Sequence, residues 1–232
     1  MLQVEGVEAG YGSSKVLFGI DLELGEGQLG AMMGRNGMGK TTTVRAVSGL
    51  TPASAGSVRL AGRDITALKP YEIGQAGIAL VPEGRQVFPT LTVRENLVCT
   101  ASNRSGLGLW TLDIVFDHFP RLRERADQLG NSLSGGEQQM LAIGRALMTN
   151  PKVLILDEAT EGLAPLIRKG IWKTLGALKA QGQTTLVIDK NLDEMANVAD
   201  HVTVLVKGRV AWAGDMDAMR AVPDFAETYL GV

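Results

Sequence analysis

The chain has 232 residues, of which 45% are apolar and 21% are charged, and these values are typical of a globular protein. The formal net charge of −2 and the isoelectric point near 5.8 argue against a sequence-independent nucleic-acid-binding protein, because such proteins carry a clear basic excess. No segment reaches the ~18 consecutive apolar residues of a membrane-spanning helix, and the first residues lack the pattern of a secretion signal, so we expect any membrane association to run through a partner protein.

The first third of the sequence reads as short strands separated by Gly, Pro and Asn. The clearest candidates are Leu17–Leu24, Gln28–Met33, Ser57–Leu60 and Ile78–Val81. A helix is predicted over Thr41–Ser48, directly after a glycine-rich turn.

That turn is Gly34-Arg35-Asn36-Gly37-Met38-Gly39-Lys40-Thr41, and it matches the phosphate-binding loop of nucleoside triphosphatases. The glycines allow successive backbone N–H groups to surround a phosphate, and the helix N-terminus, which continues with Thr42, adds its positive dipole. We expect Lys40 to reach the β- and γ-phosphates and the Thr41 hydroxyl to ligate Mg²⁺. The motif predicts a phosphate-binding NTPase without specifying its kind.

The stretch from Thr92 to about Gln128 is more polar and more helical than its surroundings. It contains the single cysteine, Cys99, which cannot form an internal disulfide and therefore favours a reducing compartment. We expect the Cys99 side chain to be a small buried hydrophobe.

A second glycine-containing motif, Leu133-Ser134-Gly135-Gly136-Glu137-Gln138-Gln139, follows. Ser134 and Glu137 have the spacing of a capping box. They would open a helix whose apolar face is formed by Met140, Leu141, Ile143, Ala146 and Leu147. The two glycines allow a phosphate to approach bare N–H groups, which predicts a second anion site. The alternative is a capped helix with a flexible start.

The apolar run Val153–Leu156 is typical of a strand buried on both faces, and two carboxylates follow it. Because ligands of open α/β sheets bind at the carboxyl ends of strands, we expect Asp157 to hold Mg²⁺ through its water shell. Glu158 could polarise a water toward the γ-phosphate as a general base. Solvated acidic strand ends are common, so this reading depends on the phosphate loop upstream.

Two further apolar runs, Thr184–Ile188 and Val202–Val206, resemble Val153–Leu156. A helical segment, Leu166–Ala180, lies between Val153–Leu156 and Thr184–Ile188. This alternation predicts βαβ units and a three-layer α/β core.

The segment 133–139 resembles the signature of ABC ATPases, and the resemblance covers essentially the whole chain. It implies an α/β fold of the P-loop NTPase type, with a RecA-like core, an antiparallel β subdomain and a helical subdomain in a single ABC ATPase domain. The expected boundaries are 1–91 for the β subdomain and the phosphate-loop part of the core, 92–148 for the helical subdomain and 149–232 for the rest of the core. In that family the signature of one subunit closes over the ATP of another, which implies that Ser134, Gly135 and Gly136 contact a partner's nucleotide. Tyr11 falls where the family stacks an aromatic ring on adenine, with an ordinary tyrosine as the alternative.

Within that family, three segments most resemble the sequence of the shorter ATPase subunit of branched-chain amino acid importers: Val81–Pro89, Gln138–Ala146 and Gly162–Pro165. The resemblance implies an ATPase that uses ATP and Mg²⁺ on the cytoplasmic face of the plasma (inner) membrane. The implied partners are transmembrane permease subunits, a second ABC ATPase that is identical or a sister, and indirectly a periplasmic substrate-binding protein, without nucleic acid. The candidate docking surface for the permease is Phe88, Pro89, Leu91 and Val93, which could equally be core residues.

Three other readings remain open: an importer ATPase for urea or other amides, a weakly hydrolysing regulatory partner, and a non-transport ABC ATPase. The last usually carries coiled-coil insertions or tandem cassettes, which this sequence lacks.

Three positions differ from the commoner ABC pattern. Glu83 stands where a glutamine normally joins the core to the helical subdomain, Lys190 where a histidine normally contacts the γ-phosphate, and Ala164 where an aspartate is usual. We hypothesise that Glu83, near Mg²⁺ or the attacking water, and Lys190, near the γ-phosphate, form a compensated pair across one nucleotide site. The alternative is that both face solvent. These departures raise the possibility of slow hydrolysis, while the intact Glu158 favours activity.

Overall fold

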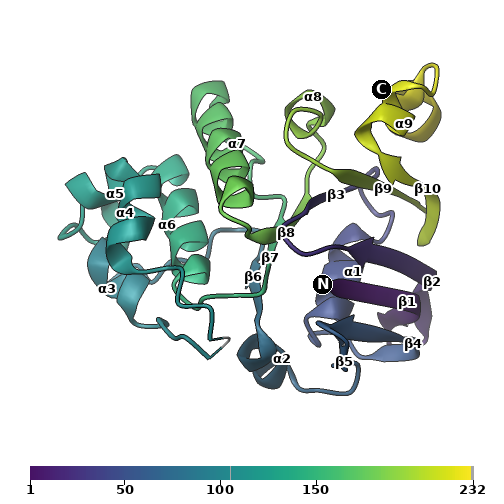
Figure 1. The fold of residues 1–232 in the computed structure, drawn as a ribbon, viewed down its shortest axis with the longest axis horizontal. Helices are drawn as coiled ribbons and strands as arrows, with labels where there is room; N and C mark the ends of the chain where they lie inside the picture. Colours follow the sequence, from purple (N-terminus) through teal and green to yellow (C-terminus); the bar gives the residue numbers. More distant parts are fainter. Residues whose placement is uncertain (105, 231–232) are drawn as a thin grey trace.

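Two β-sheets and a group of helices make up the fold in the computed structural model, which describes residues 1–104 and 106–230 (Figure 1). The six-stranded sheet has the order β10-β9-β3-β8-β7-β6. Its strands are β3 (Leu29–Met33), β6 (Ile78–Val81), β7 (Val153–Asp157), β8 (Thr184–Ile188), β9 (His201–Val206) and β10 (Arg209–Asp215). All neighbouring pairs are parallel except β9 with β10, which is antiparallel.

The predicted three-layer core is confirmed by the way β7 divides its side chains between two hydrophobic clusters. Leu154 and Leu156 belong to the cluster that contains Leu175 of α7 (Pro165–Ala180). Val153 and Ile155 belong to the cluster that contains Val44 and Val47 of α1 (Lys40–Val47). All residues of β3, β7 and β8 are buried, as their continuous apolar runs predict. Parallel strands end at one edge, which brings the segments after them together.

The second sheet is antiparallel and has the order β2-β1-β4-β5. Its strands are β1 (Leu2–Tyr11), β2 (Ser14–Leu24), β4 (Ala53–Leu60) and β5 (Arg63–Asp64). The predicted strand at Ser57–Leu60 begins earlier, at Ala53, because Gly56 can adopt a φ of 82° at an irregularity in the pairing with β1. A side chain at that position would come within 2.4 Å of the Gly6 carbonyl oxygen.

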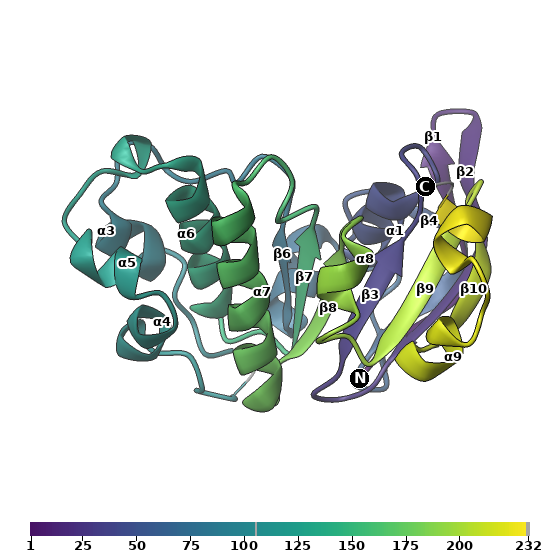
Figure 2. The same ribbon diagram turned by 90° about the horizontal axis from the view of Figure 1, so that it is seen from above.

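Four helices gather at one end of the molecule, beyond β6 (Figures 1 and 2). They are α3 (Val93–Val98), α4 (Leu112–His118), α5 (Pro120–Glu124) and α6 (Gly135–Leu147), and a 3₁₀ turn at Gly130–Ser132 precedes α6. Gly144 of α6 allows close packing, since an added Cβ would lie 2.9 Å from both Leu97 and Val115. These helices fall within residues 92–148, and the division of the chain into subdomains stays a prediction.

The remaining helices flank the two sheets. They are α2 (Pro70–Ala76), α8 (Leu192–Met195), α9 (Met216–Arg220) and a π-helical turn at Ala226–Leu230. Among residues 1–104 and 106–230, no helix combines the length and apolar character needed to cross a bilayer.

The expectation that Cys99 is buried is wrong. Cys99 is exposed and caps the C-terminus of α3, where its thiol lies 3.2 Å from the Asn96 carbonyl oxygen. The short helix α3 buries Val93, Asn96 and Leu97 on one face, and Cys99 falls outside that face.

Candidate nucleotide-binding site

The phosphate loop connects the end of β3 to α1, as its sequence predicts. The helix begins at Lys40, one residue earlier than expected, and Gly39 precedes it with a φ of 102°. Gly34 has a φ of 144°, and an added Cβ would lie 2.5 Å from the Leu205 carbonyl oxygen. Both positions therefore require glycine. A cavity of about 400 Å³ opens beside the loop and is lined by Val16, Asn36, Gly37, Gly39, Lys40, Thr41, Thr42, Glu83, Glu158 and Glu161.

The ammonium of Lys40 lies over the loop rather than in solvent. Lys40 is 6% exposed, and its Nζ donates to the carbonyl oxygens of Gly34 at 2.9 Å and Arg35 at 3.2 Å. The same Nζ is 3.7 Å from Oε1 of Glu158. A buried cation thus faces the cavity where we expect phosphate.

The turn between β9 and β10 contacts the phosphate loop at Met38. The N–H of Gly208 donates to the Met38 carbonyl oxygen at 3.0 Å, and the N–H of Lys207 donates to the Met38 sulfur at 3.1 Å. The Met38 side chain therefore turns toward this hairpin and away from the cavity, whose lining does not include Met38.

Asp157 ends β7 at the edge of the cavity and is 3% exposed. Burial raises the pKa of Asp157, and the charge of Glu83 raises it further, against the opposing effects of a hydrogen bond from Thr41 and the charge of Lys40. Its Oδ1 is buried without a hydrogen-bond partner in the described structure. An unsatisfied carboxylate oxygen beside a hydroxyl fits Mg²⁺, which prefers oxygen ligands. The described residues contain no cluster of three or more His, Cys, Asp or Glu side chains that would enclose a metal, and Mg²⁺ usually shares its coordination with phosphates and water.

Glu158 turns sharply away from the direction of β7. Its φ is 51°, and its N–H continues the sheet by donating to the Ile188 carbonyl oxygen at 2.9 Å. The carboxyl group lines the cavity beside Lys40. The pKa of Glu158 is raised to about 7, mainly by a hydrogen bond with Glu161 and, to a smaller extent, by burial. This environment suits a group that accepts a proton near neutral pH.

Lys190 forms an ion pair with Glu161, with 2.6 Å between Nζ and Oε1. This contact makes Glu161 the direct partner of Lys190, and the hypothesis of a compensated pair of Glu83 and Lys190 across the nucleotide site stays a prediction. Lys190 remains largely exposed, at 67% of its side chain, while Glu83 lines the cavity together with Glu158 and Glu161. The hydrogen bond with Glu161 raises the pKa of Lys190. Glu161 was not predicted from the sequence, although its place three residues after Glu158 is a usable signal.

The predicted capping box is confirmed at the start of α6. The Ser134 hydroxyl accepts from the N–H of Glu137 at 3.4 Å, and Oε2 of Glu137 accepts from the N–H of Ser134 at 2.8 Å. An added Cβ at Gly136 would lie 2.5 Å from Ile167 at the start of α7, so the glycine allows the two helices to approach. Ser134, Gly135 and Gly136 do not line the cavity of the phosphate loop, and their expected role toward a second subunit stays a prediction.

Tyr11 and Ala164 are exposed, and neither lines the cavity. Tyr11 ends β1 and is 48% exposed, and its hydroxyl lies 3.4 Å from the Thr42 hydroxyl. Ala164 precedes α7 and provides no side-chain cap. Val16 on β2 lines the cavity and was missed, because an alternating strand gives no sign of which side chains meet a ligand.

Comparisons with known proteins point in the same direction as this geometry. A family model described as "ABC transporter" matches residues 17–161. The high-affinity branched-chain amino acid transport ATP-binding protein BraG of Pseudomonas aeruginosa is 38% identical, over 100% of this chain and 100% of that protein. The probable branched-chain amino acid transport ATP-binding protein LivF of Archaeoglobus fulgidus is 33% identical, over 100% of this chain and 99% of that protein.

Solved structures are similar over the same extent. The crystal structure of a nucleotide-free ATP-binding cassette from an ABC transporter has a TM-score of 0.85 at 29% identity, and the match covers 100% of this chain and 99% of that one. A cassette solved in its ADP conformation has a TM-score of 0.84 at 29% identity, covering 98% of this chain and 97% of that one.

Proposed function

This chain belongs to the ABC transporter family as an ATP-binding subunit that hydrolyses ATP to drive import, and we propose that the chemistry takes place in the cavity formed by the phosphate loop and the carboxyl end of β7. The observation that carries the proposal is the meeting of Lys40, Asp157 and Glu158 at this edge of the sheet. Each supplies a different function that phosphoryl transfer to water requires.

In this proposal the loop N–H groups from Gly34 to Thr41 and the Lys40 ammonium bind the phosphates. Asp157 and the Thr41 hydroxyl would hold Mg²⁺, with Glu83 at its margin, and the bound metal would neutralise charge on the β- and γ-phosphates. Glu158 accepts the proton of the attacking water. Support for this role comes from its position beside Lys40 and from a pKa raised to about 7 by Glu161 and burial.

The test is the release of phosphate by Glu158→Gln beside the wild type. We expect hydrolysis to fall at least about 100-fold while ATP binding persists, because the amide keeps the shape of the side chain and loses the base. A variant with wild-type turnover would remove Glu158 from the role of base.

We also propose that the imported compound is a branched-chain or related amino acid. The support is that BraG and LivF match this chain over its full length, and their names specify that transport. Reconstitution with the cognate permeases and binding protein would test this: leucine-loaded binding protein should stimulate ATP hydrolysis, whereas urea-loaded protein should not.

The second half of each ATP site would come from the signature of a second ATPase subunit. Ser134, Gly135 and Gly136 begin α6 with N–H groups at a helix terminus, away from the chain's own phosphate loop. Residues 92–148 would move as a helical subdomain when two such subunits close over ATP.

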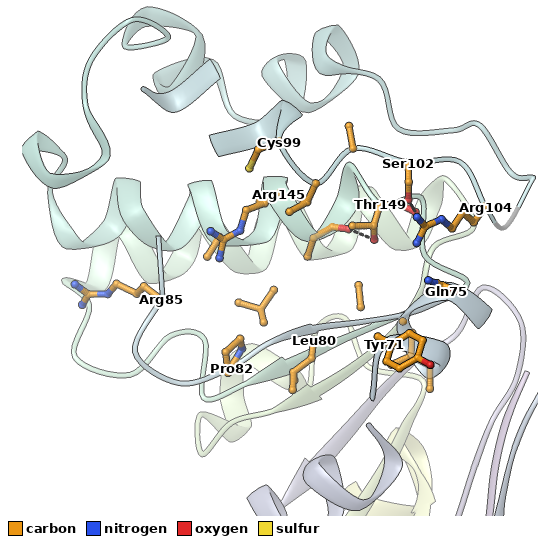
Figure 3. Close-up of a pocket in the computed structure, with 18 residues that line it drawn as sticks. Tyr71, Gln75, Leu80, Pro82, Arg85, Cys99, Ser102, Arg104, Arg145 and Thr149 are labelled. Carbon is orange, nitrogen blue, oxygen red and sulfur yellow. Dashed lines mark hydrogen bonds between the residues drawn. The ribbon is translucent and has the colours of Figure 1, made fainter. Parts of the chain in front are cut away.

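A groove beside this helical part is the proposed docking site for a permease on the cytoplasmic face of the inner membrane. The groove measures about 510 Å³ and lies between α2 and β6 on one side and α6 and the segment after α3 on the other (Figure 3). Arg85, Arg104 and Arg145 line it, and no carboxylate does. We therefore expect the docking permease segment to carry an acidic residue.

Of the four residues that the sequence suggests for docking, the structure places Val93 in the core, which was the alternative, and the role of the other three stays a prediction. Val93 is fully buried at 0% exposure and belongs to the core of the helical part. Phe88 is 43% exposed and does not line the groove, and the Arg145 guanidinium lies over its ring, 4.6 Å from the ring centre. Pro89 is exposed and Leu91 is partly buried. Arg145 also donates to the Gln86 carbonyl oxygen at 2.6 Å, so the strand-end loop and α6 are tied together.

A further inference from the structure

A compact group of hydrogen bonds joins the loop after β7 to the loop after β8. The Thr160 hydroxyl donates to Oδ2 of Asp189. The Asn191 side-chain amide donates to the Thr160 hydroxyl at 3.1 Å and to Oδ1 of Asp189 at 2.5 Å. The N–H groups of Lys190 and Asn191 donate to the same Oδ1, at 2.7 and 3.0 Å. We call Thr160, Asp189 and Asn191 the loop cluster.

Two members of the loop cluster are buried, Asn191 is partly buried, and both oxygens of the Asp189 carboxylate have hydrogen-bond donors. Thr160 is 1% exposed and Asp189 is 4% exposed. A carboxylate in such surroundings is costly unless donors surround it, and here both oxygens of Asp189 accept hydrogen bonds. Fully satisfied networks in a low dielectric are rigid. The two loops therefore have a fixed relative position, although 29 residues separate Thr160 from Asp189.

The loop cluster includes a residue of the backbone turn 158–161, which sets the direction of the Glu158 side chain. With a φ of 51°, Glu158 has a backbone conformation that is unfavourable for a residue with a side chain and persists where the surroundings determine it. On one side its N–H donates to Ile188, and on the other its carbonyl oxygen accepts from the N–H of Glu161 at 3.2 Å. Thr160 lies inside that turn, so its tether to Asp189 fixes the turn against β8.

We infer that Thr160, Asp189 and Asn191 are positioning residues for ATP hydrolysis, because they fix the turn that places the Glu158 carboxylate 3.7 Å from the Lys40 ammonium. The inference rests on the proposed role of Glu158 as the base. A group that orients an attacking water tolerates little displacement, since an error of about 1 Å can reduce the rate about 100-fold. None of the three side chains lines the cavity itself.

The first experiment replaces Thr160 by residues of similar size. Thr160→Val removes the hydroxyl with little change in volume, and we expect kcat to fall about 10- to 100-fold with the KM for ATP within about 2-fold of wild type. Thr160→Ser keeps the hydroxyl and should retain nearly wild-type kcat. A lowered kcat at constant KM is the signature of an interaction needed in the transition state, whereas a general loosening of the fold would affect both.

The second variant approaches the cluster from the other loop. Asn191→Ala removes the bridging amide without changing any residue of the turn itself, and we expect the same fall in kcat to a smaller extent. Two matched controls should retain wild-type kcat. Thr185→Val removes a buried hydroxyl of β8 that donates to Gln183 at 3.4 Å, and Asn197→Ala removes a surface amide that donates to Asp193 at 2.8 Å.

ADP affinity without Mg²⁺ and thermal unfolding are measured on every variant. The inference is overturned if Thr160→Val keeps wild-type kcat, if it loses ADP affinity in parallel with kcat, or if Thr160→Ser is as damaging as Thr160→Val. Glu158→Gln separates this result from the wider proposal. If Glu158→Gln abolishes hydrolysis and the cluster variants do not, only the positioning inference fails; if Glu158→Gln hydrolyses normally, the role of Glu158 fails first.

Discussion

The Lys190 ammonium lies 2.6 Å from the Glu161 carboxylate, and this ion pair spans the loops that follow two neighbouring strands, β8 and β7. The same carboxylate interacts with Glu158, whose pKa it raises. Glu161 therefore contacts one cation, Lys190, and one carboxyl group, Glu158. It neutralises a cation that could serve the γ-phosphate, and it adds negative charge where a polyanion is expected to bind.

We predict that Glu161→Gln lowers the KM for ATP by a few fold, because it removes a charge from the cavity and frees Lys190 for the phosphate. The effect should shrink in a Lys190→Ala background, and steady-state ATPase assays on the four variants of this cycle would measure the coupling. Since both side chains are largely exposed, the pair should contribute no more than about 1 kcal/mol to the free energy of unfolding. Equal changes in KM with and without Lys190 would show that the ion pair has no part in nucleotide binding.

The same logic applies to Glu83 and Lys190. Because Lys190 is paired with Glu161, we predict that Glu83→Gln and Lys190→His have additive effects on the activation free energy, to within about 0.5 kcal/mol. The measurement is kcat/KM for the two single variants and the double variant. A clearly non-additive result would support the compensated pair that the sequence suggests.

Asp157→Asn should change the response to Mg²⁺ more than the response to nucleotide. The buried Oδ1 of Asp157 lacks a partner, and we expect the Mg²⁺ concentration for half-maximal hydrolysis to rise about 10- to 100-fold when the carboxylate charge is lost. ADP binding in the presence of EDTA should stay close to wild type, because the phosphate loop is intact. Parallel losses in both measurements would place Asp157 in the support of the loop instead of at the metal.

Arg104→Glu should separate transport from hydrolysis if the groove receives an acidic permease segment. Arg104 is exposed at the edge of the groove and far along the chain from the phosphate loop (Figure 3). We expect basal ATPase activity of the purified subunit within about 2-fold of wild type and a loss of permease-dependent stimulation, by like-charge repulsion. Arg63→Glu, on the exposed edge strand β5, is the matched control. Normal stimulation of Arg104→Glu would exclude the groove as the site of an acidic contact.

The parts of the site that the sequence predicted are those encoded by contiguous residues. The phosphate loop needs glycines at fixed spacings, and the buried strand β7 needs an unbroken apolar run before Asp157, so both patterns are visible locally. The capping box of Ser134 and Glu137 is local in the same way. The α/β fold class could be predicted because apolar runs alternate with helical segments along the sequence.

The parts that were missed depend on residues brought together by the sheet. Nothing near Thr160 indicates Asp189, because their contact requires the register of β7 and β8 to continue past the strand ends. The ion pair of Lys190 with Glu161 was missed for the same reason. The burial of Val93 and the exposure of Cys99 depend on which face of the short helix α3 packs inward, and one and a half turns give too weak a periodicity to decide this.

The last prediction concerns the pH dependence of stability at Glu137, which is 13% exposed and pairs with Arg125 at 2.6 Å. Burial opposes its ionisation, but hydrogen bonds from Ser134 and the charge of Arg125 prevail, so the pKa of Glu137 is lowered from its ordinary value of 4.5. A carboxyl group whose pKa is lower in the folded state binds its proton more readily when unfolded. Its contribution is therefore fully present above about pH 4.5 and is lost as the pH falls through the folded-state pKa. We expect Glu137→Gln to cost about 1 kcal/mol of unfolding free energy at pH 7, because the amide can still cap the helix but loses the charge that pairs with Arg125. The difference in unfolding free energy from wild type should narrow below pH 4.5. Urea unfolding at several pH values measures this, with Glu124→Gln as an exposed control, and a cost that is constant down to pH 3 would contradict it.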